Sequence, residues 1–330
     1  MRASIEFVRA GNWVFGTGLR GGEAPKLFER MDAELRAAGS SMSLVARLDQ
    51  YYPDVRCVAP YHAARKRAFE TGQIAPSTSV IVSRLQSADA AVDVQVIAAS
   101  SASGYVPQQV QAGLNRPEAS GYTPCLRVGD MIFVAGQLAR DASGQLAAQG
   151  IQPETDYLVR WRLIPALEAG ESALDLVLKA QVYLSKPKDL PAFWQSWTQA
   201  FGKRVPPTTV VPLRHPAFLS SEATIEVNVI AAHRSARARV RDIEGDVEAR
   251  VFDGLLFVAG LTGTRMAEVL DQARSIFAAA GTDLSNVVRA LIFHSERGAY
   301  PEIRDPGFPF SAFEVETGLV VDLWGYTPSA

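Results

Sequence analysis

The pattern of apolar and polar positions divides the chain into three copies, and each copy contains the same kinds of segment in the same order. Each copy opens with a short apolar run that carries Phe near its end and is followed by a small residue and Gly. Short apolar runs flanked by Gly, Asn or Asp favour a strand over a helix. The three opening strands are therefore expected at residues 13–18, 131–136 and 255–260.

An amphipathic segment ending in Gly follows each opening strand. The closing residues are Gly39, Gly170 and Gly281, and glycine there can take the left-handed conformation that ends a helix. Each copy therefore predicts a helix after its opening strand. A short turn and another strand come next, and these strands are expected at residues 45–52, 177–184 and 287–294.

The later part of the first two copies predicts a second helix, and the later part of every copy predicts a closing strand. The second helices are expected at residues 61–70 and 190–201, and the third copy lacks this segment. Apolar and polar residues alternate in the closing strands, which are expected at residues 91–99, 224–232 and 319–326. The predicted order is ββαβαββ, taken three times, and the fold class is α+β.

The boundaries between copies follow from composition. We place the first repeat at residues 1–100, the second at 118–232 and a trimmed third at 238–330. Residues 101–117 are rich in Ser, Gly, Gln and Pro, which predicts a linker.

Composition excludes several classes of function. The chain has 33 Lys and Arg against 35 Asp and Glu, so there is no basic excess for nucleic acid or a membrane surface. No run has the length and apolarity of a signal peptide or a membrane span, and we expect a cytoplasmic protein. Two cysteines, Cys57 and Cys125, and four His give neither a disulfide framework nor a structural zinc site. We expect no metal and no cofactor.

The second repeat carries motifs of a known family. Its opening strand is preceded by Gly121-Tyr-Thr-Pro124 and ends Val134-Ala-Gly-Gln137, and its closing strand reads Ile225-Glu-Val-Asn-Val-Ile-Ala231. At these residues the chain resembles the Rid family, the reactive intermediate deaminases, which is also called the YjgF family. The likeness is close in the second repeat, clear in the first and weak in the third.

The resemblance implies an architecture and an activity. Rid proteins are usually homotrimers with mixed sheets inside, helices outside and ligand clefts between neighbouring sheets. Three fused Rid-like, chorismate-mutase-like repeats imply a single-chain pseudotrimer, which we expect to be a monomer or a loose dimer. The implied activity is hydrolysis of an imine or enamine of a small polar metabolite in an inter-repeat cleft.

One turn departs from the family's pattern. The family binds the substrate carboxylate with the Arg of a Pro-x-Arg-Ser turn, and the aligned residues here are Thr78, Thr208 and Phe310. Loss of this Arg in every repeat predicts slow turnover of short 2-imino acids. Thr208 and Thr209 are expected to bind substrate through their hydroxyls instead. Arg214 is the first candidate to supply the missing charge.

An acidic residue occupies each closing strand, at Asp93, Glu226 and Asp322. The resemblance implies that this residue orients or activates water, and a carboxyl in a partly dry cleft can act as a general acid or base. The alternative is a carboxylate that faces solvent or pairs with a nearby Arg. Strand alternation puts Glu226 and Asn228 on one face, which is expected to look toward the neighbouring repeat.

Three more residues of the second repeat complete the candidate site. Tyr122 matches the family's cleft-lining Tyr and is expected to orient the substrate. Ala135 and Gly136 match small residues whose backbone N–H groups approach the ligand, where they can hold a carbonyl or an oxyanion.

Three functions remain open at this point. The first is a Rid-type hydrolase or deaminase that adds water to an activated C=N, C=C or vinyl ether group. The second is a chorismatase-like hydrolase, since chorismatases resemble two joined Rid-like domains and use a closing-strand Glu on an enol ether. The third is a non-catalytic, ligand-binding or regulatory pseudotrimer, which loss of the Arg favours and retention of the acids opposes.

Overall fold

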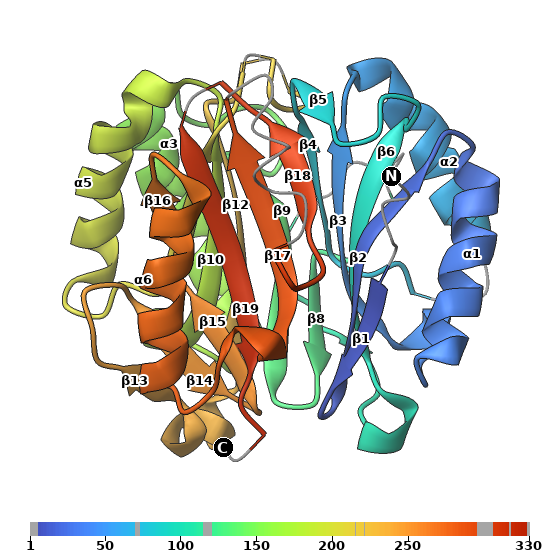
Figure 1. Cartoon of the computed structure of the whole chain (residues 1–330). Coiled ribbons are helices and arrows are strands. Elements are labelled where there is room, and N and C mark those ends of the chain that lie inside the picture. The colour runs from blue at the N-terminus through green and yellow to red at the C-terminus, as the bar shows by residue number, and fades with distance from the viewer. Residues whose placement is uncertain are drawn as a thin grey trace.

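A computed structural model describes residues 6–69, 73–114, 121–214, 216–220, 222–295, 306–316 and 318–328. The chain is an α+β protein with three mixed sheets. Helices α1 and α2 lie on one side and α3, α5 and α6 on the other, with the strands between them (Figure 1).

The first sheet has the order β1-β2-β6-β3-β4. Strand β3 pairs in parallel with β4 and antiparallel with β6. The elements of this part are β1 (Glu6–Ala10), β2 (Trp13–Gly21), α1 (Ala24–Ala37), β3 (Val45–Tyr52), α2 (Val58–Ala68), β4 (Ser77–Ile81), β5 (Arg84–Leu85) and β6 (Val92–Ala99).

The second sheet has the order β11-β10-β12-β9-β8-β7. Strand β10 again pairs in parallel with one neighbour, β11, and antiparallel with the other, β12. Its elements are β7 (Gln108–Gln109), β8 (Cys125–Val128), β9 (Met131–Gln137), α3 (Ile151–Tyr157), the π-helical segment Leu158–Leu163, α4 (Ile164–Ala169), β10 (Val177–Leu184), α5 (Leu190–Phe201), β11 (Thr208–Pro212) and β12 (Ile225–Ala232).

The third sheet has the order β13-β14-β15-β19-β17-β18-β5, and β16 also pairs with β19. Strand β5 comes from the first part of the chain and pairs with β18, so the two parts share a sheet edge. The sequence predicts no second helix between β17 and β18, and residues 296–305 of this stretch lie outside the described residues. The remaining elements are β13 (Arg241–Ile243), β14 (Ala249–Phe252), β15 (Leu255–Val258), β16 (Leu261–Gly263), α6 (Met266–Ala279), β17 (Val287–His294), β18 (Ser311–Glu314) and β19 (Leu319–Tyr326).

The three sheets follow one plan. In each, the closing strand (β6, β12 or β19) lies between the opening strand and the strand that follows the first helix. Apolar side chains of the closing strand pack under the helices, as Ile225, Val227 and Val229 do with Phe193 and Trp197 of α5. The alternate side chains of the same strand are polar and therefore lie on the opposite face of the sheet.

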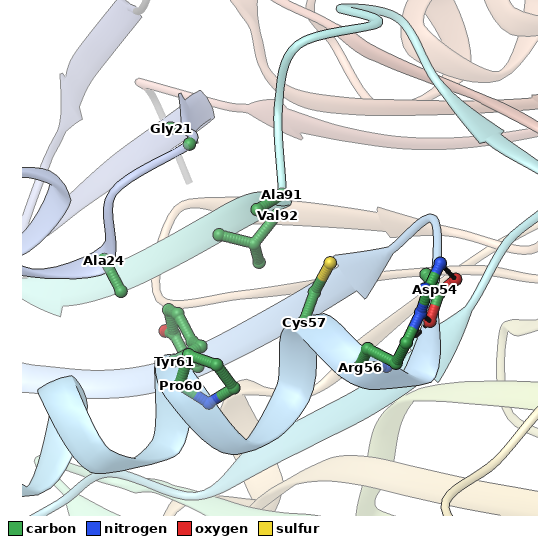
Figure 2. Close-up of a pocket in the computed structure, with 10 residues that line it drawn as sticks. Gly21, Ala24, Asp54, Arg56, Cys57, Pro60, Tyr61, Ala91 and Val92 are labelled. Atoms are coloured by element: carbon green, nitrogen blue, oxygen red, sulfur yellow. Dashed lines mark hydrogen bonds and ion pairs between the residues drawn. The ribbon is translucent and has the colours of Figure 1, made fainter.

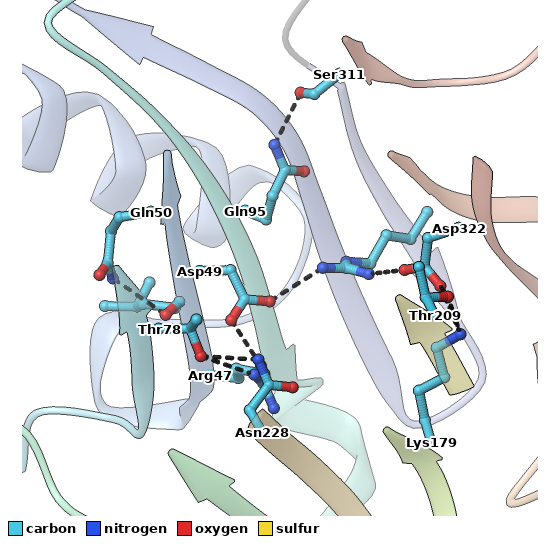
Figure 3. Close-up of polar contacts among 12 residues, drawn as sticks. Arg47, Asp49, Gln50, Thr78, Gln95, Lys179, Thr209, Asn228, Ser311 and Asp322 are labelled. Carbon is cyan, nitrogen blue, oxygen red and sulfur yellow. Dashed lines mark hydrogen bonds and ion pairs between the residues drawn. The ribbon is translucent and has the colours of Figure 1, made fainter. Parts of the chain in front are cut away.

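Buried charged side chains join the sheets to one another (Figure 3). Arg289 of β17 bridges two of them, with Nη2 3.0 Å from Asp49 Oδ2 on β3 and Nη1 2.6 Å from Asp322 Oδ2 on β19. Asp49 also accepts from Arg47, and Asp322 from Lys179 of β10 at 2.6 Å. Strands of all three sheets therefore meet in one chain of ion pairs. A buried charge without such partners would be strongly destabilising.

We expect Arg289→Gln to destabilise the fold by about 3–5 kcal/mol, because it leaves Asp49 and Asp322 each with one buried partner fewer. The matched control is Arg274→Gln, which removes an exposed Arg paired with Asp271 on α6. The free energy of unfolding from urea titration measures both. Equal stability of the two variants would show that the ion pairs do not hold the sheets together.

Candidate functional site

Glu226 of β12 lies where the second sheet meets the first. Its side chain is buried, and its carboxyl occupies space that only a glycine on the neighbouring strand β9 leaves open. A Cβ on Gly136 would lie 1.9 Å from Glu226 Oε1 and 3.1 Å from Thr78 Oγ1 of the first sheet. Gly136 has no positive φ, so it serves this close approach rather than a turn.

The polar face of β12 looks toward the first sheet, as strand alternation predicted. Asn228, two residues beyond Glu226, donates from Nδ2 to Thr78 Oγ1 of β4 at 2.8 Å (Figure 3). Arg47 of β3 donates from Nη2 to the same oxygen at 3.2 Å. The side chains around Glu226 therefore come from two sheets.

Burial, and to a smaller extent the negative charge of Asp49, raise the pKa of Glu226 to about 8. A backbone hydrogen bond from Ser79 and the charge of Arg47 oppose this rise. At neutral pH the carboxyl is therefore mostly protonated and can donate a proton. Near pH 8 it can both donate and accept one, as a general acid and base must.

The two corresponding acids lie in ion pairs. Asp93 Oδ2 is 2.5 Å from Arg20 Nε, and Asp322 Oδ1 is 2.6 Å from Lys179 Nζ. Burial alone would raise the pKa of Asp322, but Lys179 and Arg289 hold it below its ordinary value. Asp93 and Asp322 therefore pair with basic residues, which is the alternative role that the sequence left open for these acids. No ion pair to Glu226 occurs among the described residues.

Strand register changes which residues take the place of the family's Arg. The residues opposite the fifth position of β3, β10 and β17 are Thr78, Thr209 and Ser311. Relative to Thr78, the corresponding positions in the other two sheets are therefore Thr209 and Ser311, rather than the expected Thr208 and Phe310. Short Pro-containing turns align in more than one way, so the sequence alone could not choose between these residues, whereas parallel pairing of the strands fixes the position.

The two neighbouring threonines face opposite sides of the second sheet. Thr208 accepts a hydrogen bond from Trp197 Nε1 of α5 at 3.1 Å and donates to Pro206 O, so it belongs to the helix side. Thr209 accepts from Lys179 Nζ at 2.7 Å and donates to Asp322 Oδ1 at 2.8 Å. Neither hydroxyl contacts Glu226; Thr209 joins the second sheet to the third.

Other expected site residues are placed differently. The Ala135 N–H donates to Pro124 O at 2.9 Å, so it is used within the strand and does not supply an oxyanion donor. Arg214 is exposed and lies 3.8 Å from Glu316, which does not support it as the missing charge. Tyr122 is half-buried. Burial lowers the pKa of Arg65 and of Arg162, and the Tyr122 phenol opposes this lowering in both, so Tyr122 lies near both side chains.

Sequence reasoning missed Arg47 and assigned no role to Thr78. A signal for Arg47 was present, because the third residue of β3, β10 and β17 is basic in every copy, as Arg47, Lys179 and Arg289. A basic residue inside an apolar strand needs a partner. Its partners come from strands distant in sequence, so the pattern alone could not name them.

A separate pocket of about 330 Å³ opens between the starts of α1 and α2 (Figure 2). Its lining includes Cys57, Arg56 and Asp54, and none of the expected site residues. Burial and Asp54 raise the pKa of the Cys57 thiol, and Arg56 is paired with Asp54 at 2.6 Å. A protonated thiol is a poor nucleophile, so this pocket lacks an activated cysteine.

Neither a metal site nor a membrane-crossing helix occurs among the described residues. In the part of the chain that the structure describes, no group of three or more His, Cys, Asp and Glu side chains could hold a metal ion. Over the same residues, no helix has the length and apolar character needed to cross a membrane.

We expect the raised pKa of Glu226 to appear in the pH dependence of stability. Between its ordinary value of 4.5 and about 8, the folded chain binds a proton that the unfolded chain has released. The free energy of unfolding should therefore fall as pH rises through this window, by up to about 1.4 kcal/mol per pH unit. Subtracting the stability–pH curve of Glu226→Gln from that of the parent chain isolates the contribution of Glu226.

The matched control is Glu29→Gln on the exposed surface of α1, which should keep the pH dependence of the parent chain. If Glu226→Gln also keeps it, Glu226 does not have a raised pKa.

Known proteins resemble the chain mainly in its middle part. A family model described as Endoribonuclease L-PSP matches residues 113–233. A RutC family protein of Pyrococcus horikoshii is 27% identical over 119 residues, 36% of this chain and 91% of that protein. Protein HMF1 of Saccharomyces cerevisiae is 25% identical over 116 residues, 35% of this chain and 87% of its own length.

A crystal structure of chorismatase covers 70% of this chain and 78% of its own, with a TM-score of 0.53 and 14% identity, which shows a shared fold alone. The sequence matches are more specific. Residues 113–233 therefore resemble the Rid family in sequence, which confirms the resemblance that their motifs indicated.

Proposed function

We propose that the chain is a Rid-type hydrolase of a small polar metabolite and that Glu226 is its acid–base group. One observation carries this proposal. Of the three closing-strand acids, Glu226 alone is buried without an ion pair among the described residues, and its pKa is raised to about 8. An acid kept protonated in this way at neutral pH is typical of general acid–base sites.

The chemistry needs one proton donor and one water. Protonated Glu226 donates to the nitrogen of a C=N bond or to the methylene carbon of an enol ether, which makes the adjoining carbon electrophilic. Water then adds to that carbon and returns a proton to the Glu226 carboxylate. Collapse of the adduct releases a carbonyl compound together with ammonia or an alcohol, so the acid is regenerated and atoms balance.

The three sheet junctions support a pseudotrimer of repeats at residues 1–100, 118–232 and 238–330. Each junction combines a glycine of an opening strand, an acid of the same sheet and a hydroxyl of the preceding sheet. The sets are Gly136, Glu226 and Thr78; Gly260, Asp322 and Thr209; and Gly18, Asp93 and Ser311. Ion pairs fill the second and third sets, which leaves the first for chemistry.

Fold likeness favours a second candidate, a chorismatase-like hydrolase of an enol ether. The likeness spans 70% of the chain, more than either sequence relative covers. The same acid would serve both reactions, since each begins with protonation by a carboxylic acid. The substrate decides between them.

We expect Glu226→Gln to abolish turnover while keeping the fold. Imines formed in place by an amino acid oxidase, and chorismate as an enol ether, provide the two substrate classes. The rate of carbonyl release should fall by roughly 10²–10⁴ in this variant, because glutamine cannot donate or accept the proton. In the parent chain the rate should decline above about pH 8, where Glu226 loses its proton.

The control is Glu29→Gln, which should retain the parent rate. Full turnover by Glu226→Gln with an altered melting temperature would make Glu226 a structural residue and favour a non-catalytic, ligand-binding chain.

We expect a monomer or a loose dimer in solution, because three fused repeats already satisfy one another's inner sheet faces. Light scattering at low concentration should give a mass of 35.7 kDa, or an equilibrium with twice that mass. A stable assembly of three chains would overturn the pseudotrimer.

A further inference from the structure

A surface groove lies between the helical stretch 151–169 and α5. Its volume is about 500 Å³, which is within the range of small-molecule sites. Side chains of α3, of the π-helical segment and of α5 line it, including Asp156, Tyr157, Arg160, Trp161, Ser196 and Gln199. None of these residues belongs to the candidate site around Glu226, so the groove needs an explanation of its own.

The groove is built around the π-helical segment Leu158–Leu163. The helices that follow the opening strands of the first and third sheets, α1 and α6, are regular over 14 residues. In the second sheet the corresponding stretch changes from α3 into six residues of π-helix and then into α4. Such wide turns are rare and occur frequently at functional sites. The Trp161 side chain in this segment lines the groove and is 59% exposed.

Two opposite charges line the groove without a partner on the protein. Asp156 and Arg160 are four residues apart, a spacing at which opposite charges on a helix commonly pair. No ion pair or hydrogen bond of either side chain occurs among the described residues. The π-helical segment begins between them and widens the turn, which explains why they do not meet. A ligand that carries both charges would satisfy both residues, whereas a simple anion or cation would face one like charge.

One buried hydroxyl in the groove is also unused. Ser196 of α5 lines the groove and is 4% exposed, yet its Oγ has no hydrogen-bond partner among the described residues. Thr198 on the same helix donates from Oγ1 to Trp194 O at 2.7 Å, the usual solution for a hydroxyl inside a helix. Buried polar groups are nearly always satisfied. A charged group of a ligand in the groove would satisfy the Ser196 hydroxyl.

We propose that this groove binds a free α-amino acid with an aromatic side chain. Arg160 binds its carboxylate and Asp156 its ammonium group through charge-assisted hydrogen bonds. Because the two side chains leave adjacent helical turns, a ligand whose opposite charges share one carbon can reach both. The aromatic ring stacks on the exposed indole of Trp161, and Ser196 completes the polar contacts. This site is independent of the reaction proposed for Glu226.

Calorimetric titration with L-phenylalanine tests the groove. The comparison ligands are 3-phenylpropionate without the ammonium group, phenethylamine without the carboxylate and L-alanine without the ring, and each should bind at least about 10-fold more weakly. Arg160→Gln and Asp156→Asn should each weaken phenylalanine binding by about 10-fold. Both residues are exposed, so neither substitution disturbs the core. Ser196→Ala should weaken binding by about 2- to 10-fold. Arg274→Gln, which changes an exposed Arg of α6, should bind as the parent chain does.

Absence of phenylalanine binding, equally tight binding of either singly charged ligand, or parent-like binding by both Arg160→Gln and Asp156→Asn would overturn this assignment. Equal weakening in Arg274→Gln and Arg160→Gln would show a general effect of net charge and also overturn it. Loss of binding in Thr78→Val but not in Arg160→Gln would place the amino acid at the sheet junction beside Glu226, with the same consequence. Binding is measured without turnover, so failure of this assignment is distinguishable from failure of the proposed function.

Discussion

The bridge from Arg289 to both Asp49 and Asp322 is the interaction on which the inner structure depends. It joins the first sheet to the third, and Lys179 carries the connection to the second. Charges that are buried away from water are tolerated only when they have partners of opposite charge. The sheets consequently meet through polar faces on which Asp49, Asp93 and Asp322 each have a cationic partner.

The need for an ionic partner distinguishes the three sheet junctions from one another. Arg20 pairs with Asp93 within the first sheet, and Ser311 of the third sheet donates to the same carboxyl. Lys179 of the second sheet pairs with Asp322 of the third, so both acids are engaged in contacts between sheets. Glu226 has no such cation among the described residues, and Asp49 disfavours its ionisation. A strict homotrimer would have three identical junctions. In the proposed pseudotrimer, one chain can stabilise its assembly at two junctions and keep a titratable acid at the third.

Much of the fold and part of the candidate site were predictable from the sequence, and physical reasons explain why the rest was not. Alternation in 224–232 correctly put Glu226 opposite the apolar residues that pack under α5. It could not identify ionic partners, because Arg289 and Asp49 are 240 positions apart. Local pattern also could not fix register. Thr208 and Thr209 both follow Pro207, and only the pairing of β10 with β11 shows that Thr209 takes the inner position.

The central claim is that Glu226, which lacks an ion pair among the described residues, stays protonated at neutral pH, whereas Asp322, paired with Lys179 and Arg289, does not. Carbon-detected NMR of the side-chain carboxyls, with Glu226→Gln to assign the signal, measures this directly. The account requires the Glu226 carboxyl to titrate near pH 8 while Asp322 remains ionised throughout the neutral range. Titration of Glu226 near its ordinary value of 4.5 would contradict it.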